Sequence, residues 1–140
     1  MNDPQRQFAG ARLLVVDDAE ISAELAAEML QNLDVTCVVA NEGSAALAIL
    51  AADRNFDGIL LDCEMPDMDG YATAQAIRAM TGLADVPILA MTGHSMPEDL
   101  RHILASGMNA RLVKPLSLQR LSTELNRWIR PRAASANAGS

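Results

Sequence analysis

Five polar side chains each follow a short apolar run, and together their chemical types suit phosphate chemistry. Asp17 and Asp18 follow the first run, Asp62 the third, Thr92 the fourth and Lys114 the fifth. Lys114 is the single lysine of the chain, whose ten other basic residues are all arginine. An ammonium is a compact point charge with rotatable donors, and it suits a phosphate or carboxylate oxygen where a planar guanidinium does not fit. The set therefore combines three carboxylates, a hydroxyl and an ammonium.

The three carboxylates imply a cation if the fold brings them together. Carboxylates about 4 Å apart repel each other by roughly 4 kcal/mol per pair at an effective dielectric constant near 20. A hard divalent ion with oxygen ligands removes that cost, and magnesium is favoured over zinc because no His or Cys is placed to join the group. With the cation bound, one carboxylate can attack a phosphoryl group while Thr92 and Lys114 hold its oxygens. The chemistry predicted is phosphoryl transfer to an aspartate.

Short apolar runs alternate with segments of helical periodicity, five times over. The continuous runs predict strands buried on both faces, at residues 13–16, 35–40, 58–61, 86–91 and 110–113. The periodic segments predict helices at residues 20–33, 44–52, 71–80, 98–106 and 117–129. In the first helix the predicted apolar stripe is Ile21, Leu25, Met29 and Leu33, spaced four apart.

This alternation predicts an α/β fold, a doubly wound five-stranded parallel sheet. Right-handed crossover connections place the helices on both faces of such a sheet. Open sheets of this kind bind their ligands at the carboxyl ends of the strands. The five polar residues are therefore expected to meet at one edge of the sheet.

Length and composition limit the classes of function. A chain of 140 residues that is 50% hydrophobic can form one domain with a real core. The formal net charge of −7 argues against a nucleic-acid partner, because phosphate backbones are bound by clustered Lys and Arg. The apolar stretches are too short to span a bilayer and the first ten residues lack the apolar core of a signal peptide, so we expect no membrane association and a cytoplasmic location. Cys37 and Cys63 lie within strand-like runs and are expected to be buried free thiols.

Five motifs together make the chain resemble the receiver domain of two-component signalling, the phosphoacceptor module of response regulators and hybrid histidine kinases. They are the acidic pair Asp17-Asp18, the string DCEMPDMDG at residues 62–70, Thr92 followed by Gly93, the turn GMNA at residues 107–110, and Lys114-Pro115. The separations of 44, 30 and 22 residues along the series Asp18, Asp62, Thr92 and Lys114 are also those of the family. Each motif alone is weak, and their combination is specific.

The resemblance implies a flavodoxin-like (βα)5 fold with strand order 2-1-3-4-5. The receiver domain would cover residues 11–131, after an N-terminal extension over residues 1–10 and before a flexible tail or linker over residues 132–140. The phosphoryl donor would be a phosphohistidine on a histidine kinase or a histidine phosphotransfer protein, and the downstream protein target stays unknown.

The resemblance also assigns roles to the site residues. Asp62 is the phosphoacceptor, Thr92 the switch hydroxyl, and Lys114 the ammonium that pairs with Asp62 at rest and with the phosphate afterwards. Mg²⁺ would be bound by Asp18 and Asp62, by Asp17 through a water, and by the backbone carbonyl of Glu64. The residues Met65 to Gly70 match the loop that shapes the site, with Gly70 allowing a tight entry to the third helix.

One position near the site departs from the family pattern, and two others are positions that by analogy tune the lifetime of the acyl phosphate. Arg111 stands three residues before the lysine, where the family usually has an aromatic switch residue or His, and it is too polar to turn inward without a partner. We expect Arg111 to stay on the surface as a partner contact. Glu64 and His94, each two residues beyond a site residue, are expected to pair across the mouth of the site and to slow hydrolysis of the acyl phosphate.

The sequence leaves several functions open. The switch is expected to be no enzyme beyond its own phosphorylation and slow autodephosphorylation, either as a stand-alone regulator, a phosphorelay shuttle or the receiver module of a hybrid histidine kinase. A phosphorylation-independent interaction module is disfavoured because all five site groups are present. Haloacid-dehalogenase-type phosphatases share the aspartate, magnesium, hydroxyl and lysine, but they place the nucleophile on an early strand and an acidic pair after the lysine, whereas here the acidic pair comes first.

Overall fold

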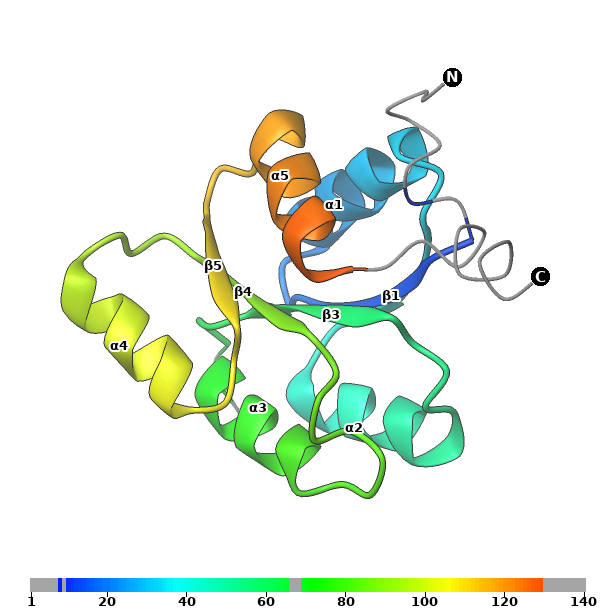
Figure 1. The fold of residues 1–140 in the computed structure, drawn as a ribbon, viewed down its shortest axis with the longest axis vertical. Helices are drawn as coiled ribbons and strands as arrows, with labels where there is room; N and C mark the ends of the chain where they lie inside the picture. The colour runs from blue at the N-terminus through cyan, green and yellow to red at the C-terminus, as the bar shows by residue number, and fades with distance from the viewer. Residues whose placement is uncertain (1–7, 9, 66–68, 130–140) are drawn as a thin grey trace.

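A computed structural model describes residues 8, 10–65 and 69–129 of the chain. Its strands are β1 (Arg12–Val16), β2 (Thr36–Ala40), β3 (Gly58–Asp62), β4 (Ile88–Thr92) and β5 (Ala110–Val113). Its helices are α1 (Glu20–Asn32), α2 (Gly43–Ala52), α3 (Gly70–Arg78), α4 (Pro97–Ala105) and α5 (Leu118–Trp128). Strands and helices alternate along the whole described chain, as the sequence predicts (Figure 1).

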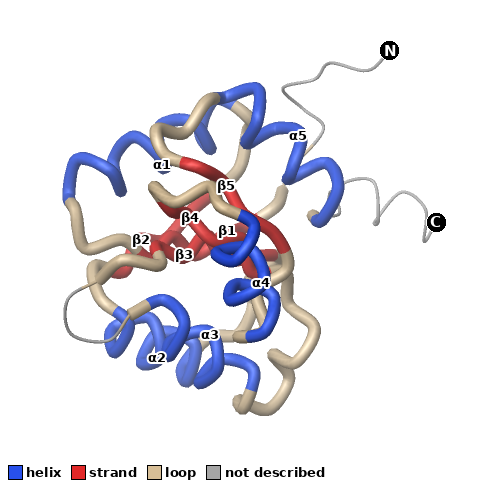
Figure 2. The backbone as a smooth tube through the Cα atoms, turned by 90° about the vertical axis from the view of Figure 1, so that its left-hand side faces the viewer, coloured by secondary structure: helices blue, strands red, loops and turns tan. Residues whose placement is uncertain are grey.

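The five strands form one parallel sheet in the order β2-β1-β3-β4-β5. Helices α1 and α5 cover one face, and α2, α3 and α4 pack on the other (Figures 1 and 2). The predicted doubly wound fold and strand order are confirmed. Because β1, β3 and β4 occupy the middle of the sheet, their carboxyl ends lie next to one another at one edge.

Burial differs between the central and the edge strands. β3 and β4 are buried along their whole length, as continuous apolar runs predict. β2 has a single neighbouring strand, and Val39 within it is 44% exposed. In β5, the other edge strand, only Leu112 is buried, so the prediction that all five strands are buried on both faces is wrong for β2 and β5. Val35 and Val86 also precede their strands instead of belonging to them.

The first helix presents a different face to the sheet from the one predicted. Its buried residues are Ala23, Ala26 and Leu30, whereas Ile21 is 75% and Leu25 50% exposed. The small side chains of Ala23 and Ala26 let the helix approach the sheet closely, and Leu30 packs into the core beside them, while Ile21 and Leu25 are left on the outside. The predicted stripe is therefore wrong for Ile21 and Leu25, which lie on the surface, and right for Leu33, which is buried, and for Met29, which packs against the core.

The parts of the chain outside the main elements are only partly described. Phe8, within the predicted N-terminal extension, is fully buried and packs in the core beneath α1 and α5. The predicted tail over residues 132–140 lies outside the described residues. Cys63 is buried and Cys37 half-buried, and both are free thiols. Within the described residues, no helix is long and apolar enough to cross a bilayer.

Candidate functional site at the carboxyl edge of the sheet

The fold brings the three predicted carboxylates together. Asp17 and Asp18 follow β1, and Asp62 ends the neighbouring strand β3. One carboxylate oxygen from each residue lies within 4.8 Å of the others. Asp17 and Asp62 are buried at 0% and 2% exposure, and Asp18 is exposed. Two of the three negative charges are thus removed from water.

Lys114 supplies the nearest positive charge. Its Nζ lies 3.5 Å from Asp62 Oδ1 and 3.3 Å from Asp17 Oδ2. The pairing with Asp62 was predicted, and the closer contact with Asp17 was not. Burial lowers the pKa of Lys114, but the charges of Asp62 and Asp17 outweigh burial and hold it above its ordinary value. Lys114 is therefore fully charged at neutral pH.

Asp17 is fixed from several sides. Its Oδ1 accepts the N–H of Ala19 at 3.0 Å, and its Oδ2 accepts the hydroxyl of Ser22. Ser22 lies in the first turn of α1 and is not among the site residues predicted from the sequence. Its spacing of five residues from Asp17, on a helix that begins immediately after the acidic pair, is the signal that could have found it. Ser22 and Lys114 together leave Asp17 few open positions for a direct ligand.

Asp62 is buried, and burial disfavours the charged form of its carboxyl group. The pKa of Asp62 is raised to about 6, chiefly by burial and in smaller part by the neighbouring Asp17. A hydrogen bond from the Glu64 N–H (3.0 Å) and the charge of Lys114 act in the opposite direction and lower it. The described cluster therefore holds three carboxylates against a single ammonium, with two of the carboxylates buried. A hard cation with oxygen ligands compensates such an excess, so the donor set fits magnesium.

Thr92 ends β4 and is completely buried. Its Oγ1 accepts the N–H of His94 at 3.0 Å and lies 3.4 Å from Glu64 Oε1. The same Glu64 oxygen accepts the Gly93 N–H at 2.9 Å, and Oε2 lies 3.0 Å from His94 Nε2. The predicted contact between Glu64 and His94 is confirmed, and its effect on hydrolysis stays a prediction.

The loop after β3 is described only in part. Residues 66–68 of the motif lie outside the described residues. Asp69 caps α3 by accepting the Ala72 N–H at 2.9 Å. A Cβ on Gly70 would lie 2.4 Å from the Asp62 carbonyl oxygen. Gly70 is thus required because α3 begins against the backbone of the predicted phosphoacceptor.

The comparisons with known proteins agree with this geometry. The model of the response regulator receiver domain family matches residues 13–126. This chain belongs to that family. It is 39% identical to the sensor histidine kinase RcsC of Salmonella typhi over 113 residues, which are 81% of this chain and 12% of RcsC. The chain therefore spans a small part of that relative.

Two solved receivers share the fold. The chemotaxis protein CheY4 of Vibrio cholerae is 31% identical with a TM-score of 0.81, and the match covers 86% of this chain and all of CheY4. The receiver domain of the sensor histidine kinase PA1611 of Pseudomonas aeruginosa is 33% identical with a TM-score of 0.78, and the match covers 86% of this chain and 98% of that one. That structure holds a magnesium ion coordinated in its active-site cleft.

Within this receiver, Arg111 is half-buried on β5. Its Nη1 donates to the carbonyl oxygen of Met96 at 2.9 Å, at the start of α4. The guanidinium thus ties β5 to the loop between β4 and α4. The bond to Met96 was not predicted from the sequence, and a role of Arg111 in partner contact stays a prediction.

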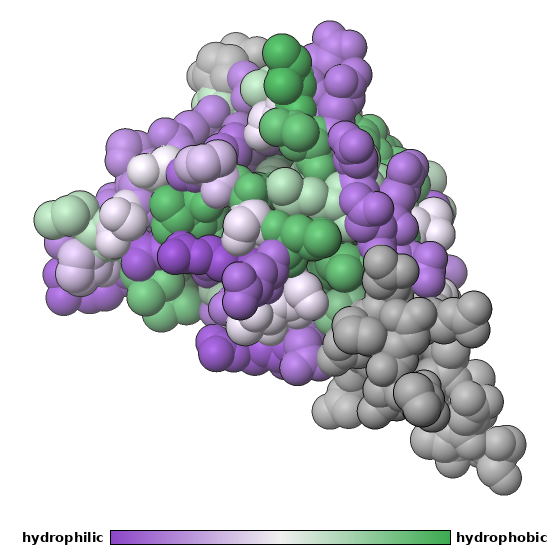
Figure 3. Space-filling model, turned by 90° about the horizontal axis from the view of Figure 1, so that it is seen from above, coloured by the Kyte–Doolittle hydropathy of each residue, from purple (hydrophilic) through white to green (hydrophobic). Residues whose placement is uncertain are grey.

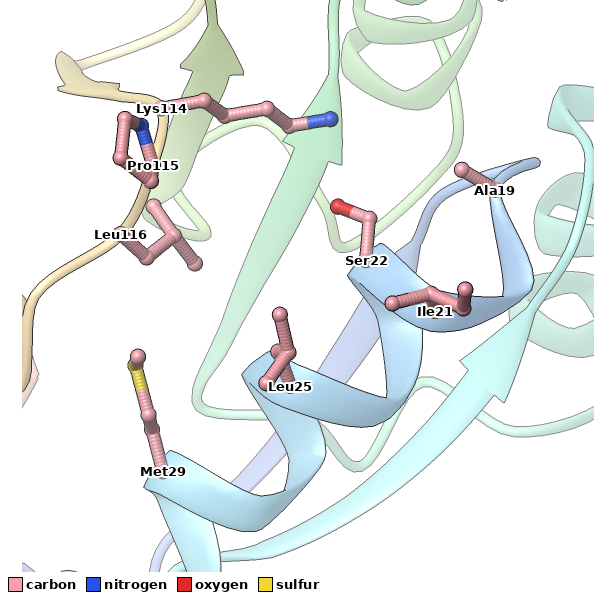
Figure 4. A pocket seen from close by; sticks show the side chains of 8 residues that line it. All are labelled: Ala19, Ile21, Ser22, Leu25, Met29, Lys114, Pro115 and Leu116. Atoms are coloured by element: carbon pink, nitrogen blue, oxygen red, sulfur yellow. The ribbon is translucent and has the colours of Figure 1, made fainter.

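An apolar groove of about 540 Å³ opens beside the receiver's acidic site. Its lining residues come from α1 and from the segment after β5: Ala19, Ile21, Ser22, Leu25, Met29, Lys114, Pro115 and Leu116 (Figure 4). The Lys114 ammonium and the Ser22 hydroxyl lie at one end, where both contact Asp17. Seen from the side of α1 and α5, hydrophobic side chains gather within a hydrophilic surround (Figure 3). The groove therefore leads directly to the acidic site.

Proposed function

We propose that this receiver is a phosphoacceptor signalling switch that takes a phosphoryl group onto Asp62 from a phosphohistidine and then changes its partner-binding surface. The observation that carries the proposal is the buried Asp62 carboxylate, 3.5 Å from the Lys114 ammonium and grouped with Asp17 and Asp18. A carboxylate can act as a nucleophile toward phosphorus, and the ammonium, together with a cation that the further acids would hold, would offset the negative charge of the phosphoryl group.

In the transfer step an Asp62 carboxylate oxygen forms a bond to phosphorus. The phosphorus–nitrogen bond of the phosphohistidine breaks, its electron pair stays on the imidazole, and that nitrogen takes up a proton. The product is an aspartyl phosphate, a mixed anhydride. Lys114 and the Thr92 hydroxyl donate to phosphoryl oxygens, where negative charge is concentrated.

Mg²⁺ would be held by Asp18 and Asp62, by Asp17 through a water, and by the Glu64 carbonyl. When bound, it would neutralise charge on the phosphoryl oxygens. The three contacts that already occupy the Asp17 oxygens support an indirect role for that residue. Asp18 is exposed and open to a direct ligand.

The test is phosphorylation by acetyl phosphate with magnesium, followed by intact mass. Wild type should gain one phosphoryl group, and Asp62→Asn should gain none. Asp34→Asn is the matched control, because Asp34 is an exposed acid in the turn before β2, and it should label like wild type. Absence of a mass gain in wild type, or an equal gain in Asp62→Asn, would remove the proposal.

The phosphohistidine donor is proposed to dock a helix of its own in the groove along α1. Docking there brings the donor to Asp62, because Lys114 and Ser22 form the end of the groove nearest the site. The exposed glutamates of α1, Glu20, Glu24 and Glu28, give the groove an acidic rim, so the partner helix should carry basic residues around an apolar stripe.

Leu25→Asp is expected to slow transfer from a phosphorylated histidine phosphotransfer protein at least tenfold, because a charge in an apolar contact is costly. Labelling by acetyl phosphate should stay unchanged. Leu104→Asp on α4 is the control, since Leu104 is 49% exposed and Leu25 50%. Equal transfer rates to the Leu25 and Leu104 variants would show that the donor docks elsewhere.

The match to a segment of RcsC favours the hybrid-kinase receiver as the context of this domain. In that setting the receiver would take its phosphoryl group from a kinase and pass it to a phosphotransfer protein. A phosphorelay shuttle uses the same site and the same groove.

A further inference from the structure

The side chain of Glu64 occupies hydrogen-bond donors at the mouth of the site. Its Oε1 accepts the Gly93 N–H at 2.9 Å and lies 3.4 Å from the Thr92 hydroxyl. Its Oε2 lies 3.0 Å from His94 Nε2. The Gly93 hydrogen bond is the largest cause of the lowered pKa of Glu64, so the carboxylate is charged and held by this backbone amide.

The same donors lie at the end of the strand that neighbours Asp62. Asp62 ends β3 and Thr92 ends the adjacent strand β4, with Asp62 paired to Met91 in the sheet register. Lys114 already approaches Asp62 and Asp17 from the side of β5. On the β4 side, the donors are the Thr92 hydroxyl and the Gly93 amide. Both donate to the Glu64 carboxylate in this structure.

We propose that Glu64 is an internal anion that stands in for the phosphoryl group in the unphosphorylated receiver and must leave before Thr92 and Gly93 can bind a modified Asp62. This inference rests on the proposed function and adds a regulation of that same site. Glu64 and Asp62 are two residues apart, so one short segment carries both the acceptor and its competitor.

The surroundings of Glu64 allow this exchange. Its side chain is 46% and that of His94 61% exposed, so the pair can swing outward without opening the core. His94 keeps a partner for the carboxylate once Oε1 is expelled. The exchange therefore reduces the net gain of the phosphorylated state, because each hydrogen bond that the phosphoryl group gains from Thr92 or Gly93 is offset by one that Glu64 loses.

Beryllofluoride with magnesium is a probe of this competition, since it binds an aspartate carboxylate as a phosphoryl analogue. We expect Glu64→Ala to bind beryllofluoride about tenfold more tightly than wild type, because the competing charged hydrogen bonds are gone. Glu64→Gln should lie between the two, because its amide oxygen can still accept from Gly93 without a charge. Glu98→Ala removes the same charge from an exposed residue of α4 and should match wild type.

The Gly93 amide resonance gives an independent readout of the contact itself. Without ligand it should move in Glu64→Ala and not in Glu98→Ala, and with beryllofluoride the wild-type and Glu64→Ala positions should converge. If Glu64→Ala binds the analogue no more tightly than Glu98→Ala, the inference is wrong while the proposed function stands. If wild type binds no analogue at all, the proposed function fails and the inference with it.

Discussion

Replacing Arg78 with alanine is expected to lower the free energy of unfolding by about 3–5 kcal/mol. Arg78 ends α3, and its Nε donates to the Gly107 carbonyl at 2.8 Å. Its Nη1 donates to the carbonyls of Leu83 (3.0 Å) and Val86 (2.6 Å), and its Nη2 to Asn109 Oδ1 (2.9 Å). One guanidinium therefore joins α3 to the segments that lead into β4 and β5, and its loss leaves carbonyl groups without donors.

Urea unfolding of Arg78→Ala, Arg78→Lys and wild type measures this effect. Lysine should recover only a minor part of the loss, because one ammonium cannot reach acceptors that a planar fork reaches in several directions. Arg101→Ala, at an exposed position of α4, is the control and should stay within about 0.5 kcal/mol of wild type. If Arg78→Ala lowered the free energy of unfolding by less than about 1 kcal/mol, the hydrogen bonds of Arg78 would not hold these segments together as argued.

Asp62→Asn is expected to stabilise the magnesium-free protein at neutral pH by roughly 1–3 kcal/mol. Burial raises the pKa of Asp62 to about 6, above its ordinary value of 3.8, so the folded state favours the protonated acid. The stability gained from protonation is present below about pH 4 and is lost as the pH rises through about 6. Above that pH a buried charge opposes folding, and the neutral amide of Asn removes it.

Unfolding curves of wild type and Asp62→Asn between pH 4 and pH 8, measured with a chelator present, test whether the substitution stabilises the protein. The advantage of Asp62→Asn should grow from pH 4 to pH 7 and then level off, and added magnesium should reduce it because wild type gains a bound ion. Asp34→Asn should show no such pH dependence. An advantage that is absent at pH 7.5, or that shrinks as the pH rises, would show that Lys114 already compensates the buried charge.

The sequence alone determined the order of elements and the identity of the residues at the strand ends. Continuous apolar runs and helical periodicity are local signals, and parallel strands must end at a common edge. That geometry is enough to predict that Asp17, Asp18 and Asp62 meet, and it predicts Thr92 and Lys114 beside them.

Tertiary structure decided which side chains are buried and which residues pair, because local sequence patterns do not encode contacts between distant segments. Ile21 and Leu25 have the spacing of a core stripe, yet the alanine face of α1 packs on the sheet and leaves them to line a groove. Lys114 and Asp17 are 97 residues apart, and only the finished sheet brings the ammonium closer to Asp17 than to Asp62.

The contacts of Glu64 and Arg78 were also decided only by the tertiary structure. Glu64 accepts hydrogen bonds from donors at the end of β4, and Arg78 donates to carbonyls in the segments before β4 and before β5. Side-chain type and spacing set which groups a residue offers. Which partner receives them depends on packing between segments far apart in the chain, and that is decided only when the sheet and its helices are assembled.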